Sequence, residues 1–335
     1  MIEYLPWSNK TLNIANYKYK NGHFSILDIE LGGMCNLNCI YCDSPDRNKI
    51  FSSLERVNYM ISTLQFDWIF ICGLGEPTFS NNKNQLIRIL EECKKHGIKC
   101  SIFTNLIEFD DVLYKYIYED ILYIMFKLDT FDPIKMKKIY RRDDIDYNML
   151  NTKINKLTSF VKVQDNCTNI CASIVPTTLN YDELPKIIDF CLKHNIFPLL
   201  GDLENSGKGQ DVYDILKLND KQLKSIKSLF KDYKIPICPS VLYGIHILYN
   251  GSIAVDKETG LSCHWFWLEE PKIKILGDIK DYDNINDIEE DIKKYRLKNL
   301  DFVRKQILNI DSLIFGGCGG DIKYLLQSYI ELYKD

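Results

Sequence analysis

Short apolar runs alternate with segments of helical periodicity over the first two thirds of the chain. Six runs are continuous enough to form strands buried on both faces of a parallel sheet; they cover residues 26–31, 68–72, 98–103, 121–128, 170–175 and 196–200. Apolar positions recur every three or four residues over 52–66, 83–96, 110–119, 133–140, 147–162 and 182–194. This alternation predicts an α/β fold with six parallel strands joined by right-handed crossovers.

The pattern changes near residue 235. Residues 246–255 form two apolar runs around Asn250-Gly251, a strong signal for a two-residue hairpin turn, and 284–299 has the pattern of an amphipathic helix. A chain of 335 residues has room for one large α/β domain and a small appendage. We therefore expect an N-terminal segment (1–23), an α/β domain (24–234) and a small C-terminal α+β extension (235–335).

The charge balance and the cysteine content limit which partners and which cellular compartment we expect for this protein. The 42 Lys and Arg residues are balanced by 46 Asp and Glu, and no basic stripe stands out, which argues against a nucleic-acid partner. The N-terminus has no signal-peptide core, and no apolar stretch approaches the length of a membrane span. We therefore expect a cytoplasmic protein without a membrane partner, whose twelve cysteines serve as metal ligands and core side chains.

Three cysteines, Cys35, Cys39 and Cys42, closely follow the first apolar run. A loop at the end of a strand would let their thiolates converge where a ligand can approach. A closed structural zinc site needs four Cys or His ligands, and no histidine lies between His23 and His96. A cubane iron–sulfur cluster has four irons, so three cysteines leave one iron open for another ligand. A zinc knuckle and chance clustering are the alternatives.

A second candidate site follows the second apolar run. There the sequence Gly73-Leu74-Gly75-Glu76-Pro77 ends the strand with two glycines, which let the backbone turn tightly and expose its polar groups to a ligand. An ordinary strand-to-helix turn is the alternative. Because the cysteines also lie at a strand end, the two segments together favour a ligand site.

The C-x3-C-x2-C spacing, with Tyr41 before the last cysteine and the glycine-rich segment downstream, resembles the radical SAM superfamily. Leu74 departs from the family's GGEP pattern, which has glycine there. The resemblance implies a partial (β/α)6 barrel of the TIM type; a full eight-unit barrel is the alternative fold. It also implies a [4Fe–4S] cluster on Cys35, Cys39 and Cys42, whose open iron binds the amino and carboxylate groups of S-adenosylmethionine (SAM).

The same resemblance implies further residues around SAM. Gly73, Gly75 and Glu76 would hold its amino group, with Tyr41 near the adenine through its backbone. Polar residues at later strand ends are candidates for binding the ribose and carboxylate or for lining the site: Thr104, Asn105, Lys127, Asp129 and Glu204. Polar loop ends without a ligand are the alternative. An electron donor such as flavodoxin or ferredoxin is implied as a partner.

The C-terminal extension carries Cys238 before the hairpin, Cys263 after it and Cys318 between glycines. With Leu276-Gly277-Asp278-Ile279, these cysteines resemble the twitch or SPASM-like extension of radical SAM enzymes, which implies a second, auxiliary iron–sulfur cluster. A full SPASM extension has about seven cysteines, so at most one auxiliary cluster is expected. Its fourth ligand would be substrate, water, His264 or another side chain. Buried structural cysteines are the alternative.

The resemblance implies an enzyme that cleaves SAM reductively and abstracts a substrate hydrogen with a 5′-deoxyadenosyl radical. Twitch and SPASM-like extensions often accompany peptide maturation, so a ribosomally made peptide is the leading substrate. Radical oxidation or rearrangement of a small molecule, such as a sugar, aminocyclitol or nucleotide, is the rival, and the short N-terminal segment favours it. A structural metal-binding module is the non-enzyme alternative, but it gives the 73–77 segment no role.

Overall fold

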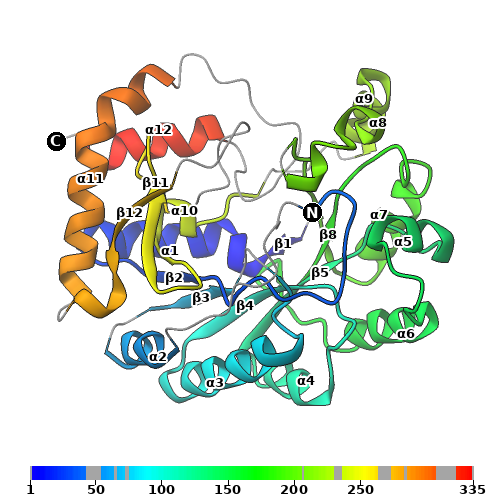
Figure 1. Cartoon of the computed structure of the whole chain (residues 1–335), viewed down its shortest axis with the longest axis horizontal. Coiled ribbons are helices and arrows are strands. Elements are labelled where there is room, and N and C mark those ends of the chain that lie inside the picture. The colour runs from blue at the N-terminus through cyan, green and yellow to red at the C-terminus, as the bar shows by residue number, and fades with distance from the viewer. Residues whose placement is uncertain are drawn as a thin grey trace.

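The chain folds around one open, mostly parallel sheet with helices packed along it (Figure 1). A computed structural model describes residues 2–42, 54–63, 66–71, 75–205, 207–229, 236–262, 273–282, 285–306 and 322–333. The strand order of the sheet is β12-β11-β10-β2-β3-β4-β5-β8-β9. The described strands do not close into a barrel, because β12 and β9 remain at its two edges. This confirms the predicted α/β class and the partial barrel.

The six parallel strands and the helices between them match the sequence pattern. The strands are β2 (Ile26–Ile29), β3 (Trp68–Ile71), β4 (Lys99–Thr104), β5 (Leu122–Lys127), β8 (Ile170–Ile174) and β9 (Phe197–Leu200). The helices are α2 (Leu54–Thr63), α3 (Ser80–His96), α4 (Asp111–Tyr118), α5 (Pro133–Tyr140), α6 (Tyr147–Thr158) and α7 (Leu184–Lys193). Gly97 ends α3 in the left-handed conformation, as a C-terminal glycine commonly does.

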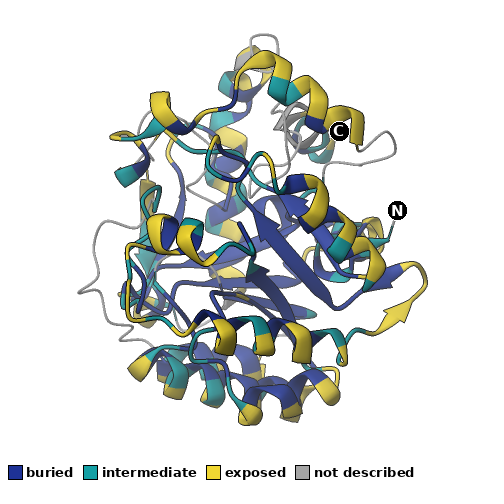
Figure 2. Cartoon of the chain, turned by 90° about the vertical axis from the view of Figure 1, so that its right-hand side faces the viewer, coloured by how far each residue is buried: buried dark blue, intermediate teal, exposed yellow. Residues whose placement is uncertain are grey.

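The two faces of the sheet have different neighbours. Cys100 in β4 is hydrogen-bonded to Cys93 in α3, so this residue faces the helices. Ser101, next in the strand, points to the opposite face, where its hydroxyl lies 2.8 Å from that of Tyr4. Figure 2 shows the buried sheet above helices whose outer surfaces are exposed. The sheet is therefore packed on both sides, which explains its continuous apolar runs.

The N-terminal segment contains helix and strand structure that our sequence analysis did not predict. It contains β1 (Glu3–Tyr4), the 3-10 turn η1 (Leu5–Trp7) and α1 (Asn9–Lys20). β1 pairs with β7 (Cys167–Thr168), which also pairs with β6 (Val163–Gln164), in a separate small sheet. The hydroxyl of Ser8 caps α1 by accepting from the backbone nitrogen of Thr11. Through Tyr4, this segment contributes to the face of the main sheet opposite the helices.

The predicted C-terminal hairpin is present, and it extends the main sheet. β10 (Gly244–Ile247) and β11 (Ser252–Asp256) are antiparallel, and β12 (Ile273–Asp278) adds at the edge. β10 also pairs in parallel with β2, with His246 opposite Asp28. The sheet therefore runs across the predicted boundary at residue 235, while the division into domains stays a prediction.

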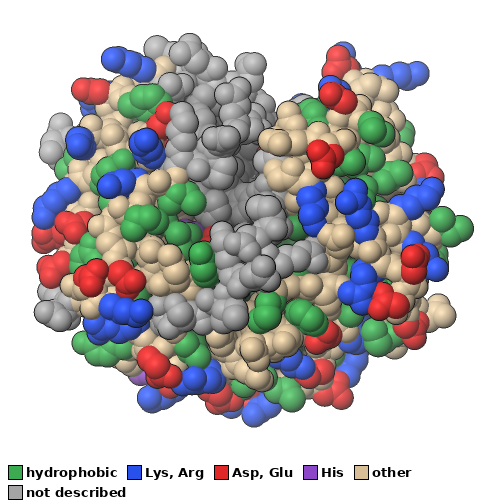
Figure 3. Space-filling view, in the orientation of Figure 1, with side chains coloured by type: hydrophobic (Ala, Val, Ile, Leu, Met, Phe, Trp, Pro, Cys, Tyr) green, Lys and Arg blue, Asp and Glu red, His purple; other side chains and the backbone are tan. Residues whose placement is uncertain are grey.

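The remaining elements lie around this extended sheet. They are η2 (Gly207–Gly209), α8 (Tyr213–Leu216), α9 (Asp220–Leu229), α10 (Ser240–Tyr243), η3 (Ile279–Asp281), α11 (Ile285–Gln306) and α12 (Ile322–Leu332). In Figure 1, α11 and α12 lie beside β11 and β12, at the end of the molecule away from α5 to α7. No described helix is both long and apolar enough to cross a membrane. On the described part of the face in Figure 3, acidic and basic side chains are interspersed.

Candidate active site

The three predicted cluster ligands lie on one loop at the C-terminal end of β2, which we call the cysteine loop (residues 30–42). Cys35, Cys39 and Cys42 are each half-buried. The backbone nitrogen of Cys42 donates to the carbonyl oxygen of Cys39 at 3.2 Å, which tightens the last turn of the loop. The thiols therefore belong to the edge of the sheet where the carboxyl ends of the parallel strands meet, the usual ligand edge of such sheets.

Neighbouring segments hold the cysteine loop in place. The backbone nitrogen of Asn38 donates to the carbonyl oxygen of Tyr140 at the end of α5, at 3.1 Å. A guanidinium nitrogen of Arg142 donates to the carbonyl oxygen of Asn36 at 2.6 Å. The side-chain amide of Asn105, after β4, donates to the Asn36 side-chain oxygen at 2.7 Å. Our sequence reasoning missed Asn36 and Arg142, because these contacts join segments far apart in the chain.

Gly75 packs directly against the backbone of the cysteine loop. It has a φ of +77°, and a Cβ atom placed on it would lie 2.4 Å from the carbonyl oxygen of Gly32 and 2.6 Å from that of Met34. The next residue, Glu76, donates its backbone N–H to the Met34 oxygen at 2.8 Å. Only glycine meets both the positive φ and the close approach. The glycine-rich segment therefore shapes the cysteine loop.

The Glu76 carboxylate is buried and linked to the end of β4. Its Oε1 accepts from the Thr104 and Thr78 hydroxyls, both at 2.6 Å, and from the Thr78 backbone nitrogen at 3.1 Å. Its Oε2 accepts from the backbone nitrogen of Asn105 at 2.7 Å. Burial raises the pKa of Glu76, while these hydrogen bonds lower it in part. Glu76, Thr104 and Asn105 are thus bonded to one another, and their predicted contacts with SAM stay predictions.

Tyr41 joins the cysteine loop to the ends of β5 and β8. Its hydroxyl donates to Oδ2 of Asp129 at 2.6 Å and accepts from the Lys127 ammonium at 2.8 Å. Asp129 also accepts from the backbone nitrogen of Val175 at 2.9 Å and forms an ion pair of 2.5 Å with Lys127. Burial lowers the pKa of Lys127, but Asp129 and Cys39 reverse this, so the net pKa is raised and the ammonium stays charged. The three side chains form one hydrogen-bonded unit, in which Asp129 is fully buried and Tyr41 and Lys127 are partly buried.

The loop that follows β9, the last of the six parallel strands, also contacts the cysteine loop. The backbone nitrogen of Lys208 donates to the carbonyl oxygen of Cys42 at 3.1 Å, and its ammonium bonds the side chain of Asn38. The half-buried Glu204 belongs to this loop, and a Cβ on Gly209 would lie 2.3 Å from its carbonyl oxygen. Glu204 therefore lies near the predicted site. Gly73 lies outside the described residues.

Comparison with a family model identifies a domain within the chain. The sequence model of the radical SAM superfamily matches residues 29–191, which contain the cysteine loop and the ends of β3, β4 and β5. Residues 29–191 are a radical SAM domain. This confirms the resemblance and implies a [4Fe–4S] cluster and SAM as cofactors of an enzyme. No curated protein matches the chain in sequence.

Solved structures show the same fold over most of the chain. Streptococcus suis SuiB bound to S-adenosylmethionine has 16% identity and a TM-score of 0.57, with 95% of this chain and 78% of that chain covered. SuiB bound to its precursor peptide SuiA has 16% identity and a TM-score of 0.50, with 83% and 70% covered. Histidine-tagged anSMEcpe with bound AdoMet has 15% identity and a TM-score of 0.50, with 92% and 96% covered. At these identities the likeness concerns the fold.

The donor set of the radical SAM domain, three cysteines on one loop, suits a cubane cluster with one open iron. Among the described residues, no three His, Cys, Asp or Glu side chains are arranged around one metal ion. A cubane cluster does not need that arrangement, because each cysteine binds a different iron. Burial raises the pKa of the Cys39 thiol to about 11, with Lys127 lowering it in part, so binding a cluster must displace a proton from this sulfur.

Hydrogen bonds join the segment that follows Cys238 to Ser262, the last described residue before Cys263. Cys238 is buried, while Cys263 and Cys318 lie outside the described residues. Ser262, which precedes Cys263, donates its backbone N–H to the carbonyl oxygen of Val241 at 2.9 Å. The fully buried Arg296 of α11 donates to the Leu242 carbonyl oxygen at 2.6 Å and to the Ser262 hydroxyl at 2.9 Å. These bonds bring Ser262 next to the segment that follows Cys238, while an auxiliary cluster stays a prediction.

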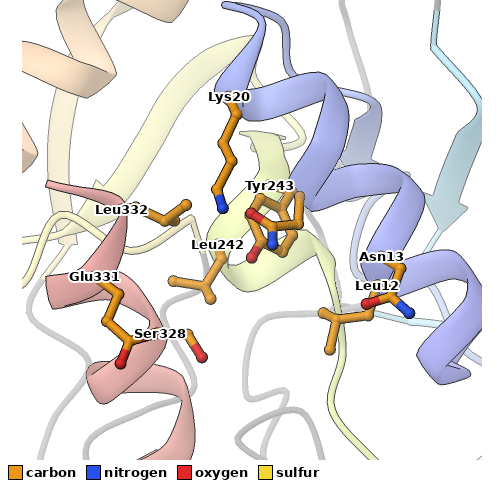
Figure 4. Close-up of a pocket in the computed structure, with 9 residues that line it drawn as sticks. Leu12, Asn13, Lys20, Leu242, Tyr243, Ser328, Glu331 and Leu332 are labelled. Atoms are coloured by element: carbon orange, nitrogen blue, oxygen red, sulfur yellow. The ribbon is translucent and has the colours of Figure 1, made fainter.

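A cavity elsewhere in the structure does not match the SAM site. It has a volume of about 140 Å³ and lies between α1, α10 and α12 (Figure 4). A pocket for a ligand of drug size has about 300–1,000 Å³. None of the predicted SAM or cluster residues lines it; its lining consists of Leu12, Asn13, Asn16, Lys20, Leu242, Tyr243, Ser328, Glu331 and Leu332. We therefore assign it no part in the radical SAM chemistry.

Gly75→Ala should prevent cluster binding without unfolding the chain. The added methyl group collides with the backbone of Gly32 and Met34, so the cysteine loop must move. Iron and sulfide analysis after anaerobic reconstitution should show a loss of about four irons per chain, the content of the radical SAM cluster. Gly97→Ala is the matched control: its φ is also positive, at +69°, but nothing lies within 4 Å of the added atom. Equal iron contents in the two variants would contradict the role of Gly75.

Glu76→Gln should lower the free energy of unfolding in the absence of SAM by about 2–3 kcal/mol, because an amide cannot accept all four hydrogen bonds. Urea unfolding of the apoprotein measures this. The control Glu55→Gln removes an exposed carboxylate paired with Arg88 and should cost about 0–1 kcal/mol. If Glu76→Gln unfolds like the parent and only SAM binding weakens, the carboxylate acts mainly on SAM.

Proposed function

We propose that this chain is a radical SAM enzyme that modifies a ribosomally made peptide. One observation carries the radical chemistry: the three-cysteine loop is locked at the C-terminal edge of the sheet by Gly75, in a domain that matches the radical SAM superfamily. The fold shared with SuiB, including its complex with the precursor peptide SuiA, supports a peptide substrate. An auxiliary cluster on Cys238, Cys263 and Cys318 has two supporting observations: Cys238 is buried, and Ser262, which precedes Cys263, is hydrogen-bonded to Arg296.

Each residue of the site would have a separate role in binding the cofactors. When bound, a reduced [4Fe–4S] cluster and SAM supply a 5′-deoxyadenosyl radical that removes a hydrogen atom from substrate. Cys35, Cys39 and Cys42 would hold the cluster and leave one iron for SAM. Gly75 and Tyr41 fix the loop against β3, β5 and β8, which keeps the cluster at a set place relative to the strand ends. The cluster would receive its electron from a partner such as flavodoxin or ferredoxin.

One aromatic side chain on the face of the sheet opposite the helices is exposed. Phe103 lies in β4, two residues after Ser101 and on the same face, in register with Met125 of β5. It is 41% exposed, whereas most side chains of this strand are buried. An exposed aromatic side chain two residues before Asn105 offers an apolar surface close to the cysteine loop. A reactive primary radical needs a substrate held at contact distance with water excluded, and such a surface serves both needs.

Replacing Cys35, Cys39 and Cys42 by alanine should abolish formation of 5′-deoxyadenosine from SAM under dithionite and remove about four irons per chain. The change removes every proposed thiolate ligand of the radical SAM cluster. Chromatography of the nucleoside products and iron analysis measure the result. Cys191→Ala removes a buried cysteine of α7 and should leave both unchanged. A triple variant that still forms 5′-deoxyadenosine would overturn the proposal.

The substrate class is tested with a short peptide encoded beside the gene. Incubated anaerobically with the reconstituted enzyme, SAM and dithionite, this peptide should change in mass, and deuterium placed in it should appear in 5′-deoxyadenosine. Mass spectrometry measures both. The peptide could instead stay unchanged while deuterium is transferred from a sugar, aminocyclitol or nucleotide. That result would contradict the peptide substrate and favour the rival small molecule, and it would still agree with the radical chemistry.

A further inference from the structure

Three buried ionisable side chains join the C-terminal extension to the first strand of the barrel. His246 of β10 lies between Asp28 and Glu30, with Nδ1 3.6 Å from Oδ2 of Asp28 and Nε2 3.6 Å from Oε1 of Glu30. All three are at most 2% exposed. Burial opposes a charge on His246, but the two carboxylates outweigh it and raise its pKa to about 10. The imidazole is therefore a cation at neutral pH.

These charges specify the register of β10 on β2. His246 is directly opposite Asp28 in the parallel pair. A slip by one residue would turn His246 to the other face of the sheet and leave the carboxylates buried without the cation. An uncompensated buried charge is strongly destabilising, so wrong registers are disfavoured by more than lost packing. Because β10 and β2 are far apart in the sequence, few other local features determine which residues of the two strands pair.

The same group of charges connects to both proposed cluster sites. The hydroxyl of Ser240 donates to Oδ2 of Asp28 at 3.0 Å and lies 3.2 Å from the sulfur of Cys238. At the other end, Glu30 donates its backbone N–H to the Ile247 carbonyl oxygen at 3.0 Å and begins the cysteine loop. One contiguous set of buried contacts therefore runs from Cys238 to the exit of β2.

We propose that His246 is a positioning residue: held between Asp28 and Glu30, it fixes the C-terminal hairpin in register on β2 and thereby sets the place of Cys238 relative to the cysteine loop. The part of this proposal that concerns the register of the hairpin depends only on the contacts given above. The part that concerns Cys238 as a ligand rests on the proposed auxiliary cluster. His246 acts through Asp28 and Ser240 and touches neither cluster. Its charge, rather than its volume, does the positioning.

The test uses the full chain with Cys35, Cys39 and Cys42 replaced by alanine, reconstituted anaerobically, so that iron reports on the auxiliary cluster. His246→Gln keeps a side chain of similar reach but leaves two buried carboxylates facing each other. It should retain less than half of the parent's iron and lower the urea midpoint. Adding Asp28→Asn and Glu30→Gln makes all three positions neutral. This triple change should restore most of the iron content and most of the urea midpoint. His96→Gln is the control, because His96 pairs with Glu92 at the surface of α3 and should change neither.

The outcomes separate the two proposals. Parent-like iron and urea midpoint in His246→Gln would overturn the positioning role, and so would a loss that the neutral array does not recover, because packing alone would then explain it. A parent that binds no iron would refute the auxiliary cluster. In that case the urea midpoints still decide the register proposal: recovery in the neutral array supports it, and no recovery overturns it.

Discussion

Two backbone segments pass so closely at Gly75 that no side chain fits between them, and the candidate site depends on this contact. The cysteine loop leaves β2 and immediately meets the segment after β3, where Gly75 faces the carbonyl oxygens of Gly32 and Met34. Glu76 then carries the connection to the end of β4 through its buried carboxylate. The shape of the loop is therefore set by the ends of neighbouring strands. This is how an irregular loop can present three thiols in a fixed arrangement.

Buried charged groups with several partners hold the two parts of the chain together. Arg296 donates to backbone carbonyls of α10 and to the Ser262 hydroxyl, and His246 lies between Asp28 of β2 and Glu30 directly after that strand. Each such group would be costly to bury alone, so each one strongly favours the single arrangement in which it is satisfied. The Tyr41, Lys127 and Asp129 unit follows the same principle beneath the cysteine loop. The site thus rests on specific polar contacts added to an ordinary apolar core.

The sequence predicted the parts of the fold that have a local signature. Six apolar runs became six parallel strands because a strand buried on both faces needs mostly apolar residues. α1 was missed because it is polar with only a narrow buried stripe, formed by Thr11, Ala15 and Tyr19. The pairing of β10 with β2 was missed because parallel pairing over such a distance leaves no local pattern. Asp28 in β2 and Glu30 directly after it were the available signal, since buried charges need partners.

The sequence also located the loops of the candidate site but not the bonds within it. Thr104, Asn105 and Asp129 lie at the expected strand ends, yet their polar atoms contact Glu76, Asn36 and Tyr41. The central claim remains that the cysteine loop carries a cluster with one iron open to SAM. Electron paramagnetic resonance of the dithionite-reduced, reconstituted chain, recorded before and after SAM is added, tests it most directly. The account predicts that SAM changes the cluster spectrum; an unchanged spectrum at saturating SAM would contradict it.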